Sequence, residues 1–184
     1  LVELNAKAFL QGKGQIDLLF VLPLKNMNDE FFIKGSLGEM SIGLLNPITE
    51  GTSYITMPTG VIQRIDFDFI ANKYNSEGRL SADYSGLSIV VLKELHISEQ
   101  KRRKHHMIAT FLANNMIKKK NQPKSLLYRE GYIEVEREEV TGFWEYLWQN
   151  LYAGMTHSLI HTEKKKKRKV KLYKKKRDLI QMYN

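Results

Sequence analysis

The sequence of 184 residues has no cysteine and no long uninterrupted apolar run. The absence of cysteine excludes disulfides, thiolate nucleophiles and thiolate metal sites, and it leaves the redox compartment open. No apolar run approaches the roughly 18 residues that span a bilayer, so we expect neither a transmembrane helix nor a signal peptide in this sequence. The first residue is Leu and a strand pattern is already under way there, so we expect the chain to be a piece of a longer protein.

The motifs of common enzyme classes are also missing from the sequence. No glycine-rich phosphate loop, nucleophile elbow or catalytic triad spacing occurs, and we therefore predict a non-enzymatic protein without a cofactor. Asp66 and Asp68 would share one face of a strand, as paired catalytic acids do. They have no nearby base or metal ligand, so we expect them to lie on a solvated surface.

Histidines offer two further candidate sites, and neither predicts a metal centre. His157 and His161 stand four apart and can meet on one face of a helix. They lack the acidic neighbour of a His-Glu-x-x-His motif, so we expect no metal there. His105 and His106 are adjacent and would point in different directions on a helix.

Positive charge is concentrated near the end of the chain. Residues 164–177 hold 11 of the 29 Lys and Arg residues and no acid, and only one of the 20 acids follows them, so 18 bases and 19 acids remain in residues 1–163. The net charge of +9 therefore describes the tail, and it does not indicate that the folded part binds nucleic acid. The basic run consists of Lys164, Lys165, Lys166, Lys167, Arg168 and Lys169. This run matches the pattern of a basic nuclear-localisation peptide. It could equally bind nucleic-acid phosphates or anionic lipid head groups.

The stretch 60–95 has the clearest pattern, which is that of an antiparallel β-meander. Its first arm alternates an apolar row with a largely charged row, and the apolar row comprises Ile65, Phe67, Phe69 and Ala71. Turn-forming residues follow at 73–78, and the alternation resumes at Leu80 and Tyr84. Ser85-Gly86 interrupts the second arm and predicts a bulge or bend there.

Shorter patterns place the remaining elements. We predict strands at 1–10, 15–24, 31–37, 52–57 and 130–137, with the strand at 15–24 central or covered on both faces, and helices at 98–118 and 141–160. Residues 39–45 fit either a strand or a helical turn, and Asn46-Pro47 is expected to end that element. Pro58-Thr59-Gly60 predicts a turn. Residues 118–124 predict a basic loop.

These elements predict an α+β, mainly β fold, in which a curved antiparallel sheet forms a rolled β-groove with two C-terminal amphipathic helices and a basic tail. We expect one domain over residues 1–160 and a polybasic tail over 161–184, disordered or helical on binding. The last helix carries a broad stripe that includes Trp144, Trp148 and Tyr152. Such a stripe is typical of a helix that covers a sheet end or lies in a lipid interface, and we predict that these aromatic residues and the basic run contact a membrane.

Several short patterns occur in the same order as in a known family and cover most of residues 13–160. They are 31–35 leading to Met40, Leu45-Asn46-Pro47, Gly60 with the strand after it, Gly78 to Tyr84-Ser85-Gly86-Leu87 with 88–92, the basic loop 118–123, and Arg137 followed by Phe143, Trp144, Tyr146, Leu147, Trp148 and Gly154. In this order the chain resembles the C-terminal region of AsmA-like proteins of the Gram-negative cell envelope. It departs from the family at Gln122, which separates Asn121 from Pro123, and in its longer polybasic tail.

The resemblance implies a periplasmic protein that is anchored in the inner membrane by a segment outside this chain. It also implies a long rolled sheet whose apolar groove carries lipid chains, with a role in outer-membrane lipid homeostasis. Its partners would be a phospholipid or another acyl-chain lipid and an anionic membrane surface, with no specific nucleic acid.

The residues themselves allow such a groove, because a curved sheet with one apolar face can shelter hydrocarbon without a reactive group. The predicted groove residues are Ile16, Leu18, Phe20, Ile65, Phe67, Phe69, Leu80 and Tyr84. The alternative is a structural scaffold or a nucleic-acid-associated module that uses the polybasic tail, with a sheet that serves only as a core. The pattern leaves open whether the apolar face is open or plugged by the helices.

Overall fold

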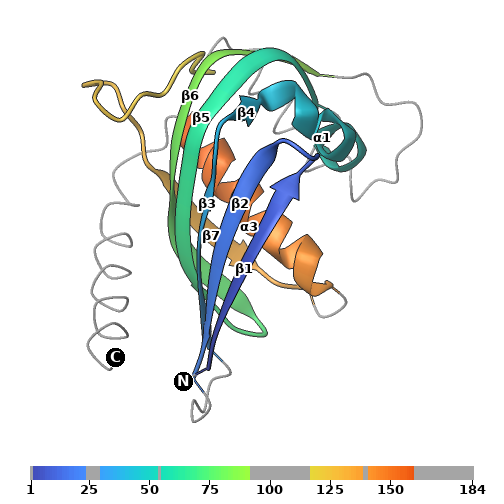
Figure 1. The fold of residues 1–184 in the computed structure, drawn as a ribbon, viewed down its shortest axis with the longest axis vertical. Helices are drawn as coiled ribbons and strands as arrows, with labels where there is room; N and C mark the ends of the chain where they lie inside the picture. The colour runs from blue at the N-terminus through green and yellow to red at the C-terminus, as the bar shows by residue number, and fades with distance from the viewer. Residues whose placement is uncertain (1, 24–29, 54, 92–116, 139–140, 160–184) are drawn as a thin grey trace.

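The computed structural model describes residues 2–23, 30–53, 55–91, 117–138 and 141–159. They form an antiparallel seven-stranded sheet in the order β1-β2-β3-β5-β6-β7, with the short β4 paired to β5. The strands are β1 (Val2–Leu10), β2 (Gly14–Leu22), β3 (Phe31–Leu37), β4 (Met40–Ser41), β5 (Ile55–Ala71), β6 (Asn75–Val91) and β7 (Gly131–Glu136). Strands β1 and β7 lie at the two ends of this order, and the sheet curves around helix α3 (Phe143–Leu159) (Figure 1). The predicted mainly β, antiparallel fold class is therefore confirmed.

The first two predicted strands form a hairpin. Val2 pairs with Leu22 and Leu10 with Gly14, so all nine residues of β1 lie against β2. The turn uses the left-handed region at Gln11 and Gly12, where φ is 50° and 68°. Strand β2 lies between β1 and β3 and is therefore interior to the sheet. Most of its residues are half-buried, so it is not covered on both faces.

Strands β5 and β6 confirm the predicted meander, with a tighter turn than the sequence indicates. The amides of Tyr74 and Asn75 donate to Oδ1 of Asn72 at 2.8 and 2.9 Å, which closes an Asx turn directly after β5. Gly78, expected in the turn, lies inside β6. It pairs with Phe69, and a β-carbon added at Gly78 would overlap the β-carbon of Phe69.

Both long strands bend at one level. Gly60 on β5 and Gly86 on β6 have φ of 136° and 65°, and the β5–β6 register shifts three times between Thr56 and Arg64. The predicted bulge at Ser85-Gly86 is confirmed. The predicted turn at residues 58–60 is wrong, because these residues remain in β5 and bend it without ending it.

Residues 39–53 differ from the prediction. Strand β4 and a 3₁₀ turn (Ile42–Leu45) lead directly into helix α1 (Asn46–Ser53), so Asn46-Pro47 begins a helix where the sequence predicted an end. Pro47 occupies the first turn of α1, where an amide hydrogen has no helical acceptor in any case. The Asn46 side chain also joins α1 to β5, because its Oδ1 accepts from the amide of Met57 at 2.8 Å. Strand β5 consequently starts at Ile55.

Helix α3 packs mainly against β7 and β6 and closes the core. It matches the helix predicted at 141–160. A polar contact joins α3 to β6, since the hydroxyl of Ser76 donates to Oδ1 of Asn150 at 2.5 Å and the amide of that side chain donates to the carbonyl of Tyr146 at 2.7 Å. All three residues are buried. The helix predicted at 98–118 lies outside the described residues except for 117 and 118, which are not helical, and the tail 161–184 lies outside them entirely.

Candidate functional site

The predicted groove residues share the inner face of the sheet, the face that α3 packs against. Strand pairing places all of them except Tyr84 in three adjacent rows that run from β1 towards β6. One row is Leu4, Phe20, Ile33 and Phe69; the next is Ala6, Leu18, Gly35, Phe67 and Leu80; the third is Ala8, Ile16, Leu37, Ile65 and Ala82. The structure therefore brings together residues that are up to 74 positions apart in the sequence.

The half of this face on β5 and β6 is filled by the core. Ile65, Phe67, Phe69, Leu80 and Tyr84 are at most 5% exposed and pack in one cluster with Tyr146 and Leu147 of α3. Side chains as buried as these have no free surface for a ligand, and each contributes about 1.5–3 kcal/mol to folding by its removal from water. Five of the eight predicted groove residues are thus core residues in this structure.

The other half of the inner face is only partly covered. We call it the β1–β2 apolar face, and it consists of Leu4, Ala6, Ala8, Ile16, Leu18 and Phe20. Leu4 is 53% exposed, both alanines are exposed, and the three β2 residues are half-buried. The exposure increases along each row from β5 towards β1, with increasing distance from β7 and β6, the strands against which α3 mainly packs.

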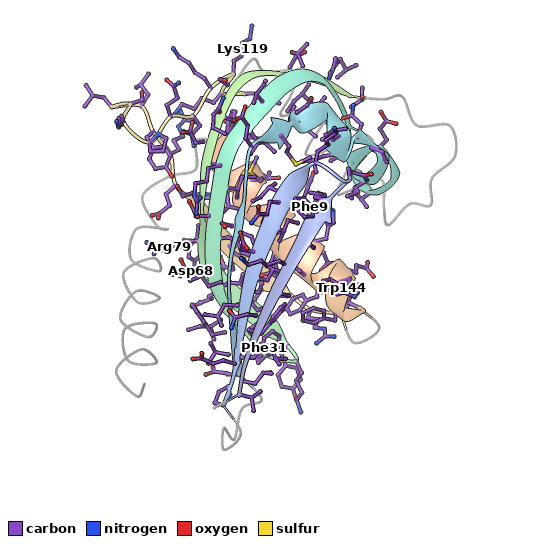
Figure 2. All side chains as sticks on the ribbon, in the orientation of Figure 1. Phe9, Phe31, Asp68, Arg79, Lys119 and Trp144 are labelled. Atoms are coloured by element: carbon purple, nitrogen blue, oxygen red, sulfur yellow. The ribbon has the colours of Figure 1, made fainter. Side chains whose placement is uncertain are left out.

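Aromatic residues at the start of α3 border this face. The ring of Phe143 lies 5.7 Å from that of Phe20 and 5.2 Å from that of Trp144, and the Trp144 side chain is 71% exposed (Figure 2). Trp148 and Tyr152, the other aromatic residues predicted to contact a membrane, are half-buried on α3. The basic residues 164–169 lie outside the described residues.

The outer face of the sheet carries charge pairs. Asp68 is only 8% exposed and accepts from Nε of Arg79 at 2.7 Å, and Arg79 also lies 3.5 Å from Glu130 (Figure 2). The prediction that Asp68 is solvated is therefore wrong. Asp66 is exposed as predicted, and its bidentate hydrogen bond with Arg64 raises the pKa of that guanidinium.

A buried polar cluster holds residues 117–130 against β6. The side chain of Asn121, fully buried, donates to the carbonyls of Ala82 and Arg129 at 2.8 and 2.9 Å and accepts from the Arg129 amide at 2.9 Å. Its backbone pairs with that of Tyr84 in both directions, and the Tyr84 hydroxyl donates to the carbonyl of Lys118 at 3.1 Å. Burial raises the pKa of Tyr84, so this hydroxyl acts as a hydrogen-bond donor and not as a base.

Comparisons with protein-family models, curated proteins and solved structures found no match to this chain. The resemblance to AsmA-like proteins therefore stays a prediction, and the functional proposal rests on the geometry of the inner face. Within the described ranges, no helix is both long and apolar enough to cross a membrane, and no three His, Asp or Glu residues gather in a group that fits a metal ion.

Some residues of the exposed apolar surface were not predicted as site residues. Leu4, Ala6 and Ala8 alternate visibly in the sequence, yet only the pairing with β2 shows that their row continues that of Leu18 and Phe20. The contact between Phe143 and Phe20 has no local sequence signal, because it joins an element near the end of the chain to one near its start.

Proposed function

We propose that this chain is a non-enzymatic lipid-binding protein that holds acyl chains against the β1–β2 apolar face. The observation that carries the proposal is the exposure of an apolar surface on the same sheet face that elsewhere forms the core. Exposed apolar side chains scattered singly are common on proteins, whereas a contiguous set on one face indicates a ligand or partner.

Hydrocarbon suits this surface better than a polar ligand does. All six residues of the face are Leu, Ala, Ile or Phe, and the nearest charges on these strands, Lys7 and Asp17, pair on the opposite face at 3.7 Å. Each methylene removed from water contributes about 0.8 kcal/mol. From Leu4 to Ala8 the strand rises about 13 Å, which accommodates a substantial part of an acyl chain lying along it.

The aromatic border extends the surface. Phe143 closes the end of the face next to Phe20, and exposed Trp144 provides an amphipathic ring of the kind found where hydrocarbon meets water. The wider role in outer-membrane lipid homeostasis, from a periplasmic position anchored in the inner membrane, is part of the proposal and is supported by the family resemblance alone.

The test uses charges on the two faces of one exposed strand. Ala6→Asp and Leu4→Asp place a carboxylate on the apolar face, whereas Asn5→Asp places the same group on the opposite face of β1. All three positions are exposed, so the substitutions leave the core intact. We expect uptake of a fluorescent long-chain fatty acid to fall by about tenfold or more in the first two variants, because burying a charge against hydrocarbon is costly, and to remain unchanged in the third.

A second measurement locates the bound chain. Trp148→Phe leaves Trp144 as the only tryptophan of the two in the sequence. We expect the Trp144 emission to shift to shorter wavelength when fatty acid is added and to be quenched by brominated acyl chains. Absence of uptake by the unmodified chain, or equal uptake by Ala6→Asp and Asn5→Asp, would contradict the proposal and favour a sheet that serves only as a scaffold.

A further inference from the structure

The loop 118–129 presents two leucines to solvent at its tip. Leu126 is 104% exposed and Leu127 74%, which makes them the most exposed large apolar residues of the described chain. The loop projects from the sheet beside β6, away from the body of the molecule (the yellow segment in Figure 1). Exposure of an aliphatic pair to water is unfavourable, so a pair in this position indicates a contact that removes it from water.

The tip is held in a defined shape. The amide of Ser125 donates to the carbonyl of Gln122 at 2.9 Å, and the amide of Tyr128 donates to the carbonyl of Ser125 at 2.9 Å, which makes two successive turns. Leu126 and Leu127 are the central residues of the second turn, a place that normally takes Gly, Asn, Asp or Pro. The Tyr128 hydroxyl anchors the far side of the turn to Oγ of Ser81 at 2.5 Å.

Hydrogen bonds of Asn121 and Lys118 fix the base of the loop. Asn121 ties the loop to Ala82 and Arg129, as described above. The ammonium of Lys118 points inward, donating to Oδ1 of Asn121 at 2.8 Å and to the carbonyl of Leu127. Desolvation, with a smaller contribution from Arg129, lowers the Lys118 pKa. Lys118 is therefore part of the scaffold that presents the leucines.

The charged residues of the loop itself are of one sign. Lys119, Lys120 and Lys124 are exposed, and residues 117–129 contain no acid. The combination of two apolar side chains at a convex tip with exposed lysines in the same loop fits a negatively charged surface that has a hydrocarbon layer beneath it.

We propose that the loop 118–129 docks on an anionic lipid bilayer, with Leu126 and Leu127 entering the boundary of the acyl chains and the three lysines facing head-group phosphates. A protein partner fits less well, since a stable protein interface buries about 800 Å² on each side and two leucines on a convex turn supply far less. A nucleic acid would meet the lysines but leave the leucines in water.

This surface is separate from the proposed acyl-chain site. Figure 2 shows Lys119, at the base of the loop, well apart from Trp144, which borders the β1–β2 apolar face. The inference therefore goes beyond the proposed function and does not depend on lipid uptake by the sheet. Variants at the tip are expected to leave fatty-acid uptake unchanged.

Single-cysteine labelling of the full chain tests the inference, because the sequence has no cysteine of its own. Leu126→Cys carries an environment-sensitive dye at the tip, and Phe9→Cys, on β1 at 66% exposure, carries the same dye as a control. The probe is a vesicle of equal parts phosphatidylglycerol and phosphatidylcholine containing nitroxide-labelled acyl chains. We expect blue-shifted and quenched emission from the Leu126 position and unchanged emission from the Phe9 position.

Charge variants with a matched control separate the loop from the basic tail. Lys119→Gln with Lys124→Gln removes two exposed charges of the loop, and Lys13→Gln with Lys34→Gln removes two exposed charges elsewhere. In the Leu126-labelled chain, the first pair is expected to raise the lipid concentration for half-maximal quenching by about tenfold, and the second pair to change it less than twofold. Leu127→Ser is expected to weaken the quenching by about the same factor as the first pair.

Two results would overturn the inference. The first is a chain that binds vesicles while the dye at position 126 stays in water, because the tail alone would then make the contact. The second is equal loss of quenching in both lysine pairs, since this would indicate a response to net charge and not to the loop.

Discussion

Gly131 on β7 and Gly154 on α3 pack backbone against backbone. A β-carbon added at Gly131 would overlap the carbonyl of Gly154, and one added at Gly154 would lie 2.8 Å from the β-carbon of Leu80. The two glycines therefore set the distance between the helix and the sheet. Because α3 fills the inner face of β6 and β7, this distance also determines how much of the core is sealed.

Gly131→Ala is expected to destabilise the fold by about 2–3 kcal/mol, because the added methyl group must push α3 away from β7. Urea denaturation measures the effect. The control is Gly51→Ala in α1, where an added β-carbon meets nothing within 4 Å. The control should stabilise by about 0.5–1 kcal/mol through its better helix propensity. Equal effects of the two substitutions would show that the packing of α3 on β7 is looser than described.

Two aspartates on the same face of β5 should differ in their contribution to stability. Asp68→Ala leaves the partly buried guanidinium of Arg79 without its 2.7 Å partner and is expected to cost about 2–3 kcal/mol. Asp66→Ala breaks an exposed pair with Arg64 and is expected to cost less than about 1 kcal/mol. The comparison is made by urea denaturation at low and high salt. A larger loss from the Asp66 variant would contradict the burial of the Asp68–Arg79 pair.

Asn121→Ala should loosen the loop 118–129. It leaves the carbonyls of Ala82 and Arg129 without a donor, and each buried group that loses its partner costs about 1–3 kcal/mol. Hydrogen exchange at the Arg129 amide, which donates to the Asn121 side chain, is expected to accelerate at least tenfold. Gln122→Ala alters an exposed neighbour and should leave this exchange rate unchanged.

Buried tyrosines make the fold sensitive to alkaline pH. Burial raises the pKa of Tyr84, Tyr132 and Tyr146 above the usual value of about 10. The unfolded chain ionises these hydroxyls near pH 10 while the folded chain keeps them protonated. The stability they contribute is therefore complete below about pH 10 and falls as pH rises towards the folded pKa, by about 1.4 kcal/mol per pH unit for each group.

Tyr132→Phe isolates one of these groups. The Tyr132 hydroxyl is buried and has no hydrogen-bond partner among the described residues, so its removal is expected to be neutral or to stabilise by up to about 1 kcal/mol at pH 7. Above pH 10 the variant should lose stability less steeply than the unmodified chain. Tyr84→Phe, by contrast, removes a 3.1 Å hydrogen bond and is expected to cost about 0.5–1.5 kcal/mol at pH 7. Circular dichroism along a urea and pH series measures both.

The regular alternation of apolar residues made the strands predictable. Ile65, Phe67 and Phe69 follow one another with period two and lie together in the core, and the turn after them is marked by its Asn residues. Such local signals identify a strand and its buried face. They do not identify what covers that face, because coverage depends on where a distant helix packs.

The predicted groove illustrates this limit. Leu18 and Phe67 have equivalent sequence patterns and lie in the same row of the sheet, yet one is half-buried and the other is 4% exposed. Phe67 belongs to the core cluster that includes Tyr146 and Leu147 of α3, whereas Leu18 only packs against that cluster. The Gly131–Gly154 contact holds α3 against β7. No feature near Leu18 or Phe67 in the sequence reports that contact.

Polar residues with structural roles were also hidden from sequence patterns. Asn46-Pro47 reads as a stop, because proline disfavours a helix before it, but the same dipeptide fits the first turn of a helix that begins there. Asn121 stands in a basic, hydrophilic stretch whose composition predicts a loop. Only the tertiary structure shows that it is fully buried and satisfied by hydrogen bonds.

Strand β1 is bonded to β2 along one side, and its nine residues include just two charged ones, Glu3 and Lys7. An edge strand can pair with an extended segment of another chain, and two charged residues give little protection against pairing between the β1 strands of two molecules. Concentrated samples are therefore expected to form gels or fibrous aggregates through β1 first. A proline or an extra lysine placed on β1 is where work on solubility and crystallisation of this protein would begin.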